Sequence, residues 1–395
     1  MIPCRTIPLA RPGCAWQGLS TFTSTSWDPY MHPTPSHSDL AEPLAFPCGQ
    51  TMKNRFMLAP MTNCQSHPDG SLSDDEFNWL TMRAKGNFGL TMTCAAHVQK
   101  AGQGFPGQLG IYSDELLDGH RKLANAIRQE DSLAVIQLHH AGMRSPADLI
   151  GEAPQCPSAD EKTGSRALTL KEVHQLRDDF IAAAVRSQKA GYDGVEVHGA
   201  HGYILCQFLS SKYNHRGDAY GGSLGNRSRI IFEIVEGVRE SCGPEFLVGV
   251  RLSPERFGIE LQECMTVSQN LIDSSLIDFI DISLWDSFKK PHEEEHQDKR
   301  LLDYFAQLDR KAVKMTVAGK IGTAAEAQAI RDANIDFVSI GRAAILHHDY
   351  PNKVINDANF SPTALPVSRK YLAAEGLSET FIDYMSRWDG FVEES

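Results

Sequence analysis

The chain has 395 residues, a hydrophobic content of 42% and a formal net charge of −12 at pH 7. This length allows one large domain or two ordinary ones, and the hydrophobic content is sufficient for a buried core. The negative charge disfavours a nucleic-acid-binding surface, which needs clustered Lys and Arg. No uninterrupted apolar run is long enough to cross a bilayer, so we expect neither nucleic acid nor membrane as a partner.

The nine cysteines are scattered, with no C-x-x-C pair and no metal-type or iron–sulfur-type spacing. The plain interpretation is a set of free thiols in a reducing compartment, which predicts a cytoplasmic protein.

Residues 1–38 differ in composition from the rest of the chain. They are rich in Ser, Thr and Pro, and Arg5 and Arg11 are the only charged residues before Asp28. This composition resembles an organelle transit peptide and leaves an organelle open as the location. The alternatives are a disordered tail or an upstream start codon, with Met31 as a later natural start. We predict a disordered tail over 1–38 and a single domain over 39–395.

Eight short apolar segments alternate with amphipathic helical stretches from residue 56 onward. Continuous apolar runs of this kind are typical of parallel strands covered on both faces. Eight βα units close most simply into a (β/α)8 TIM barrel of the α/β class, with a doubly wound open sheet as the alternative. The predicted strands are 56–61, 90–98, 133–141, 194–200, 247–253, 279–283, 314–321 and 337–343.

Local signals mark further elements around the predicted barrel. Residues 44–54 look like a hairpin that forms a lid on the barrel bottom, and residues 378–392 are typical of a short helix and a tail. Three helices should open with a capping box, in which a hydroxyl and a carboxylate satisfy N–H groups of the first turn. The boxes are Ser73 with Glu76, Thr169 with Glu172, and Thr323 with Glu326.

The carboxyl ends of the predicted strands carry a polar, partly cationic ring with small residues interleaved. Chemistry in a (β/α)8 barrel belongs at these ends. Structural polar residues alone would not be expected at so many consecutive strand ends. The ring consists of Thr62, Ala95, Gln137, His139, His140, His198, His201, Arg251, Gly319, Gly341 and Arg342.

Two glycine-containing segments, VAGKI (317–321) and SIGRA (339–343), end the last two strands. Barrels often bind a phosphate there, on backbone N–H groups exposed by glycine and at a helix N-terminus. Arg342 would add a planar charged fork, and we assign Lys320 to the same site. The alternative is that both glycines only serve turns.

Arg251 and Gln137 lie inside otherwise apolar strands. A charged residue there is costly unless it is paired. Arg251 either forms a buried pair with Glu196 or Asp281, or is aimed at an anionic ligand in the barrel mouth. The Gln137 amide, which both donates and accepts, suits the edge of a ring with adjacent N–H and C=O groups.

His198, His201 and Tyr203 follow one another where the fourth strand ends. Gly199 and Ala200 are small and permit a turn, after which both imidazoles can donate to one carbonyl oxygen with the phenol nearby. Two donors withdraw charge from a conjugated C=C and make its β-carbon electrophilic. The alternatives are a pair of structural histidines or zinc ligands, although no nearby Cys or carboxylate completes a zinc set at the usual spacing.

The segment GQGFPG (102–107) matches G-x-G-x-x-G, but no helix opens at its third glycine. We therefore predict a loop here rather than a Rossmann phosphate turn.

Four segments resemble the Old Yellow Enzyme family of NADH:flavin oxidoreductases and FMN-dependent ene-reductases. The resemblance runs in order from about residue 40 to residue 390, and the stretch around His198 is highly specific. The segments are NRFMLAPMTN (54–63), IQLHHAG (136–142), VEVHGAHGYILCQFLSSKYNHRGDAYGGSLGNRSR (195–229) and SIGRA (339–343).

The resemblance implies a barrel that binds FMN non-covalently in its mouth and uses NADPH or NADH to reduce enones, and sometimes nitro compounds. It also implies roles for individual residues. His198 and His201 would bind the substrate carbonyl oxygen, and Tyr203 would give a proton to the α-carbon. Arg251 would lie near flavin N1 and O2, and the Thr62 side chain would bond flavin O4. The remaining flavin contacts would come from Pro60, Met61, Ala95, Gln137, Gly319, Lys320, Gly341 and Arg342.

Three residues depart from the family pattern. Cys64 stands where one branch places an aromatic substrate contact, and His97 and His139 replace small residues. These departures concern the substrate range. The rival functions are a metal-dependent barrel lyase or aldolase that uses His198 and His201, and a flavin-binding protein without turnover. The sequence leaves the physiological substrate, the choice of nicotinamide and a homo-oligomeric state open.

Overall fold

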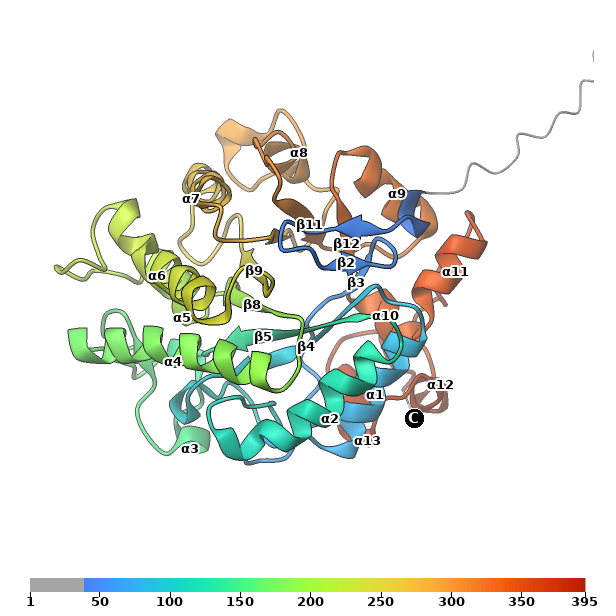
Figure 1. The fold of residues 1–395 in the computed structure, drawn as a ribbon, viewed down its shortest axis with the longest axis horizontal. Helices are drawn as coiled ribbons and strands as arrows, with labels where there is room; N and C mark the ends of the chain where they lie inside the picture. Colours follow the sequence, from blue (N-terminus) through green and yellow to red (C-terminus); the bar gives the residue numbers. More distant parts are fainter. Residues whose placement is uncertain (1–38, 395) are drawn as a thin grey trace, which may run out of the picture. The chain divides into compact units, whose positions relative to one another are not determined.

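The computed structural model describes residues 39–394, and the prediction of a disordered tail over 1–38 lies outside them. At the centre is a closed barrel of eight parallel strands, in the order β10–β11–β12–β3–β4–β5–β8–β9 (Figure 1). The predicted (β/α)8 fold is therefore confirmed. The strands are β3 Phe56–Leu58, β4 Leu90–His97, β5 Leu133–His139, β8 Gly194–Gly199, β9 Leu247–Leu252, β10 Phe279–Ser283, β11 Lys314–Ala318 and β12 Phe337–Ile340.

All eight predicted strands are present, and several end earlier than predicted. The prediction extends β3 to 61, β11 to 321 and β12 to 343, whereas the ladders stop at Leu58, Ala318 and Ile340. The chain beyond these points leaves the ladder, and Arg342 already begins a helix. The shortening therefore exposes backbone at the carboxyl rim of the barrel.

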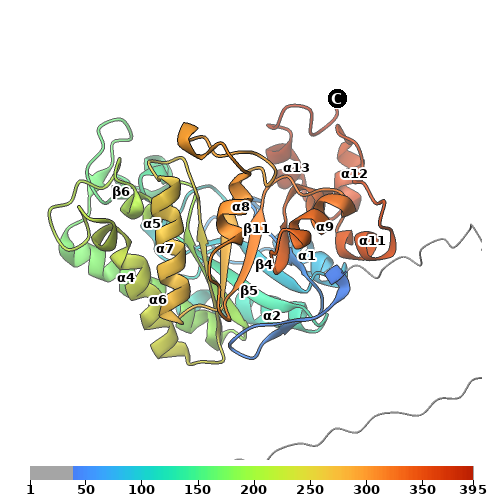
Figure 2. The ribbon, with the colours of Figure 1, turned by 90° about the horizontal axis from the view of Figure 1, so that it is seen from above.

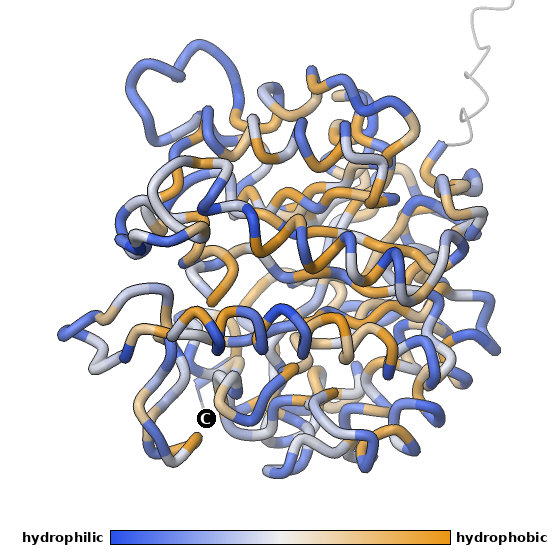
Figure 3. The backbone as a smooth tube through the Cα atoms, turned by 60° about the vertical axis from the view of Figure 1, so that its left-hand side comes forward, coloured by the Kyte–Doolittle hydropathy of each residue, from blue (hydrophilic) through white to orange (hydrophobic). Residues whose placement is uncertain are grey.

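Helices surround the strands, and no helix among the described residues is long and apolar enough to span a membrane. Figure 3 shows hydrophobic segments concentrated in the interior and hydrophilic ones along the outer loops. The helices are α1 Asp74–Lys85, α2 Leu117–Arg128, α3 Ala147–Ile150, α4 Leu170–Lys189, α5 Ile204–Leu209, α6 Leu224–Cys242, α7 Leu261–Ser274, α8 Leu301–Ala306, α9 Ala324–Asp332, α10 Arg342–Leu346, α11 Tyr350–Asn356, α12 Arg369–Ala374 and α13 Glu379–Met385.

The predicted capping boxes form at Thr169 and Thr323, but the box at Ser73 is wrong. Ser73 accepts the N–H of Glu76 as an N-cap, whereas the Glu76 side chain turns away from the helix terminus. This buried carboxyl accepts hydrogen bonds from Asn63 and Ser66 instead. The Glu76 carboxyl therefore bonds side chains outside the helix rather than the backbone N–H of Ser73.

The predicted hairpin lid is present as β1 Leu44–Ala45 paired antiparallel with β2 Thr51–Met52. Figure 2 shows this hairpin at the opposite end of the barrel from α13. The Phe46 ring lies 6.0 Å from the Phe279 ring and 5.7 Å from the Phe337 ring, centroid to centroid. The hairpin thus seals the amino-terminal end with apolar contacts and leaves the carboxyl end for a ligand.

The lid makes a stability prediction. Phe46→Ala should lower the free energy of unfolding by about 3–5 kcal/mol, because it removes a buried aromatic side chain and leaves a cavity. Urea unfolding at a fixed FMN concentration measures the change. The control Leu365→Ala, at an exposed leucine, should stay within about 0.5 kcal/mol of the parent. Equal losses in the two variants would contradict the sealing role.

Candidate active site

A cavity of about 690 Å³ opens at the carboxyl ends of the barrel strands. Its walls come from the ends of strands and from the loops that follow them. Every residue that the sequence analysis assigned to a catalytic or cofactor role lies in its lining. These residues are Pro60, Met61, Thr62, Ala95, Gln137, His198, His201, Tyr203, Arg251, Gly319, Lys320, Gly341 and Arg342.

The chain turns sharply where β8 ends, but not at the predicted position. Gly199 still pairs with Leu252 as part of the strand. The turn falls at His201 and Gly202, whose φ angles are +61° and +70°. A Cβ at Gly202 would lie 2.7 Å from the Phe257 ring, so glycine is required there. The left-handed conformation of His201 brings its imidazole back beside that of His198.

The two imidazoles meet edge to edge at the cavity wall. His198 Nε2 lies 2.9 Å from His201 Nδ1, and His201 Nε2 lies 2.7 Å from Ser283 Oγ. If the Ser283 hydroxyl donates to Nε2, the His201 proton is held on Nδ1. In this contact one facing nitrogen donates and the other accepts, and a ligand oxygen that replaces it receives a hydrogen bond from both rings when His198 carries its proton on Nε2.

Both histidines are neutral at physiological pH. Burial, followed by the charges of Arg251 and Arg144, lowers the pKa of His201 to about 3. Burial and the neighbouring His201 hold the pKa of His198 well below its usual value. A neutral imidazole donates one hydrogen bond without placing a full charge in the cavity.

Tyr203 stands beside this pair as the N-cap of α5. Its ring centroid lies 4.4 Å from that of His139 and 5.2 Å from that of His198. The Arg144 guanidinium lies 4.9 Å from the Tyr203 ring centroid and donates to the His201 carbonyl at 2.6 Å. Arg144 therefore fixes the relative position of the turn and the phenol.

The floor of the cavity is cationic and buried. Arg251 Nε lies 3.2 Å from Asp281 Oδ2, and Gln137 donates to Glu196 Oε1 at 2.7 Å. The two interpretations of Arg251 are thus compatible, because one side chain both pairs with a carboxylate and lines the cavity.

The cavity suits a flat, anionic cofactor such as FMN. Its walls include the small side chains of Ala59 and Ala95, and its floor offers the Arg251 guanidinium. At the rim, a Cβ at Gly341 would meet only the Met61 sulfur, at 3.6 Å, so the backbone there is open to a ligand. Arg342 follows at once and is exposed, as a phosphate partner requires.

Several cavity residues were missed by sequence reasoning, and most of them lie outside the predicted strands. Trp285, in the loop after β10, and Trp388, after α13, are exposed by 61% and 42% and stand in the lining. The segment that follows α13 therefore contributes to the site. The aromatic residues of segment 378–392 were the only sequence signal that this segment reaches the cavity. The other missed residues are Ala59, Phe105, Arg144, Arg256, Phe257, Ala318, Ile345, Tyr384 and Met385.

The residues that depart from the family pattern lie outside the lining. His139 stacks behind His198, with 5.3 Å between ring centroids. His97 is buried and bonds the Gln99 carbonyl through Nδ1. Gly102 ends a 3-10 helix over Lys100–Gly102, the rest of the GQGFPG segment is a loop, and no α-helix begins at Gly107.

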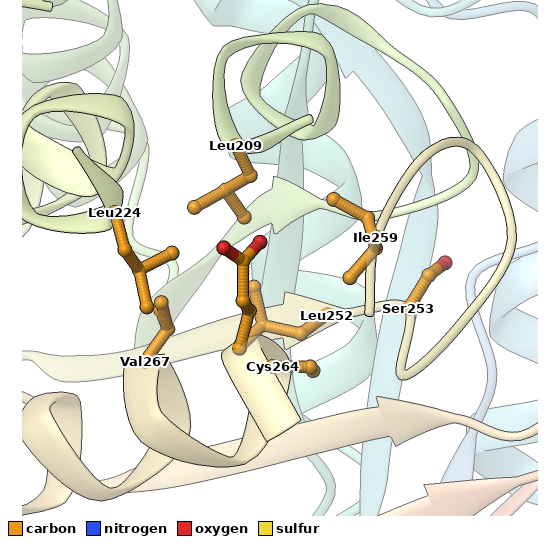
Figure 4. A pocket seen from close by; sticks show the side chains of 8 residues that line it. Leu209, Leu224, Leu252, Ser253, Ile259, Cys264 and Val267 are labelled. Carbon is orange, nitrogen blue, oxygen red and sulfur yellow. The ribbon is translucent and has the colours of Figure 1, made fainter. Parts of the chain in front are cut away.

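Other candidate sites among the described residues are minor. Within residues 39–394, the one group of three or more metal-type side chains close enough to share an ion is Glu293, Glu295 and His296, which includes neither His198 nor His201. A second pocket, between α5, α6, β9 and α7 (Figure 4), has a volume of about 10 Å³ and mostly apolar walls. It has no room for an organic ligand.

The low pKa of His201 makes a prediction about pH. Its imidazole should remain neutral from pH 8 to pH 5, because the buried site disfavours the cation. The unfolded chain binds this proton near pH 6.5, so the stabilising contribution is complete above that pH and is lost as the pH falls. NMR of labelled histidine, assigned with His201→Asn, measures the titration. A His201 midpoint between pH 5 and pH 7 would contradict the prediction.

Sequence and structure comparisons place the chain among flavoenzymes. The chain is 35% identical over 331 residues to the probable NADH-dependent flavin oxidoreductase YqiG of Bacillus subtilis, covering 81% of this chain and 88% of that protein. The structure resembles the Old Yellow Enzyme homologue NCR from Zymomonas mobilis, with a TM-score of 0.74, 27% identity and coverage of 87% and 99%.

It also resembles morphinone reductase in complex with tetrahydroNAD, with a TM-score of 0.73, 26% identity and coverage of 86% and 96%. The chain spans less than half the length of several other curated relatives.

A family model, described as NADH:flavin oxidoreductase / NADH oxidase family, matches residues 39–359. The match covers most of the chain and the whole barrel. The predicted resemblance, the oxidoreductase class and the use of FMN with a nicotinamide reductant are therefore confirmed at the level of the family. The chain belongs to the NADH:flavin oxidoreductase / NADH oxidase family, which contains the Old Yellow Enzyme homologues, and is a flavin-dependent oxidoreductase.

Proposed function

We propose that the protein reduces the activated C=C bond of α,β-unsaturated carbonyl compounds, with NADPH or NADH as the reductant. The observation that carries the proposal is the convergence of two neutral imidazoles and a phenol on one wall of the cavity. Such donors suit an oxygen that gains negative charge during the reaction. Small enones, and nitro compounds with a similar acceptor group, are the proposed substrates.

FMN is proposed to lie over the floor of the cavity, where it supplies hydride transfer between the nicotinamide and the acceptor. Arg251 would face the part of the flavin that becomes negative on reduction, and Thr62 would contact the flavin O4 edge. The rim segment with Lys320 and Arg342 would hold the phosphate. Its other proposed contacts are Pro60, Met61, Ala95, Gln137, Gly319 and Gly341.

The remaining steps of the proposed reaction are assigned to the cavity wall formed by His198, His201 and Tyr203. His198 and His201 donate to the substrate oxygen and draw charge away from the β-carbon, which then accepts the hydride. Tyr203 gives its hydroxyl proton to the α-carbon and regains a proton from solvent. The hydride and the proton together complete the reduction of the double bond. Arg144 acts through the backbone of His201 and keeps the donors aligned.

The two rival functions differ in what they require. A metal-dependent lyase needs a third ligand near His198 and His201, and the metal-type cluster found among residues 39–394 includes neither. A flavin-binding protein without turnover needs no aligned donors and no proton source. The cytoplasmic location and the homo-oligomeric state remain predictions.

The proposed activity has a direct test. The FMN-loaded protein should bleach when NADPH or NADH is added without oxygen, and 2-cyclohexenone should then restore the flavin absorbance. Stopped-flow absorbance follows both half-reactions. If the reduced protein reacts with oxygen but with none of a panel of enones and nitro compounds, the proposal is wrong.

The donor pair makes a second prediction. His198→Ala should lower the rate of the enone half-reaction by about 10²–10³-fold, because one oxyanion donor is lost. Tyr203→Phe should lower the same rate by about 10²-fold or more, because the proton source is lost. Reduction of the flavin by NADPH or NADH should change much less in Tyr203→Phe.

The control for the donor pair is His67→Ala, at an exposed histidine outside the cavity lining, which should behave like the parent. Unchanged enone kinetics in both His198→Ala and His201→Ala would contradict the carbonyl-binding role.

A further inference from the structure

Two carboxyl groups lie inside the barrel in the layer below the cavity. Glu196 on β8 and Asp281 on β10 are both fully buried, and β9 runs between their strands. Each carboxyl group shifts the pKa of the other, so the two groups are close enough to interact. Glu196 Oε2 and both oxygens of Asp281 are buried and have no hydrogen-bond partner among the described residues.

The groups that face this pair carry a single positive charge. On β9, Arg251 lies 3.2 Å from Asp281, and on β5 the neutral amide of Gln137 donates to Glu196 at 2.7 Å. The histidines above, His139 and His198, are neutral because burial lowers the pKa of each. The same layer holds two uncharged, buried hydroxyls, Thr316 on β11 and Ser339 on β12.

One proton must therefore reside between the two carboxyl groups. Two ionised carboxylates would repel each other, and two negative charges with one guanidinium would leave a net negative charge in the barrel interior. Burial, followed by the charge of Asp281, raises the pKa of Glu196 to about 8. Burial raises the pKa of Asp281 as well, but Arg251 and the contact with Glu196 act in the opposite direction and favour its anion. Glu196 thus holds the proton, and Asp281 is the anion that balances Arg251.

We propose that Glu196 and Asp281 form a proton-sharing pair that sets the net charge beneath the flavin, acting through Arg251, and thereby sets the reduction potential of bound FMN. The inference rests on the proposed position of FMN over Arg251. Two-electron reduction of FMN at neutral pH takes up one proton and leaves one negative charge on the flavin. A positive floor favours that product, and a negative floor disfavours it.

The pair predicts opposite behaviour for its two members. Asp281→Asn leaves Arg251 unbalanced and should raise the affinity for reduced FMN, relative to oxidised FMN, by roughly ten- to hundredfold. Glu196→Gln mimics the protonated acid, so its potential should match that of the parent at pH 6–7. Above about pH 8 the parent should lose the shared proton and its potential should fall below that of Glu196→Gln.

The experiment is an anaerobic redox titration of the FMN-loaded protein against a reference dye, from pH 6 to pH 9.5, for the parent and the variants. Ser339→Ala, at a buried and uncharged neighbour in the same layer, is the control and should follow the parent at every pH. The midpoint potential reports on charge, whereas a loss of packing alone would lower FMN affinity in both redox states.

If the midpoint potentials of the parent and Glu196→Gln change with pH in the same way from pH 6 to pH 9.5, Glu196 and Asp281 do not share a proton. This test holds even if Asp281→Asn fails to fold. If folded Asp281→Asn has the same midpoint potential as the parent, Asp281 does not neutralise the charge of Arg251 beneath the flavin. Neither result depends on enone turnover, so failure of the pair and failure of the proposed reaction are distinguishable.

Discussion

Closure of the barrel is the constraint on which the site depends. β12 pairs in parallel with β3, so that Ile340 lies beside Leu58, and this pairing joins the last strand of the barrel to the first. Because every strand is parallel, all eight carboxyl ends meet at one rim. Residues as distant in sequence as Thr62 and Arg342 thus line one cavity. The hairpin packed on Phe279 and Phe337 fills the other end.

The electrostatics of the cavity follow from where burial places each charge. Burial, followed by the charges of Arg251 and Arg144, lowers the pKa of His201, so this donor stays neutral beside two cationic side chains. A neutral donor pair suits a carbonyl oxygen, because the two hydrogen bonds become stronger as negative charge develops on that oxygen. The layer below contributes the opposing charge of Asp281. The charge of Arg251 is therefore balanced from below, and the histidine donors above it stay neutral.

The sequence alone predicted what depends on local pattern. Apolar runs located all eight strands, and the predicted residues at their ends line the cavity except for His139 and His140. Contacts across long sequence separations carry no local signal, and they account for the failures. Glu76 leaves its predicted cap for Asn63 and Ser66, and the turn after β8 forms at His201, whose backbone N–H bonds Ser253. The partner of the His201 imidazole, Ser283, lies 82 residues away.

The central claim is that the rim of the barrel holds FMN and that His198 and His201 bind one oxygen above it. A crystal structure of the FMN complex with an unreactive phenol or enone analogue tests this claim most directly. The account predicts one ligand oxygen within hydrogen-bonding distance of His198 Nε2 and His201 Nδ1, over a flavin that contacts Arg251. A ligand oxygen bound elsewhere, with the two histidines still bonded to each other, would contradict it.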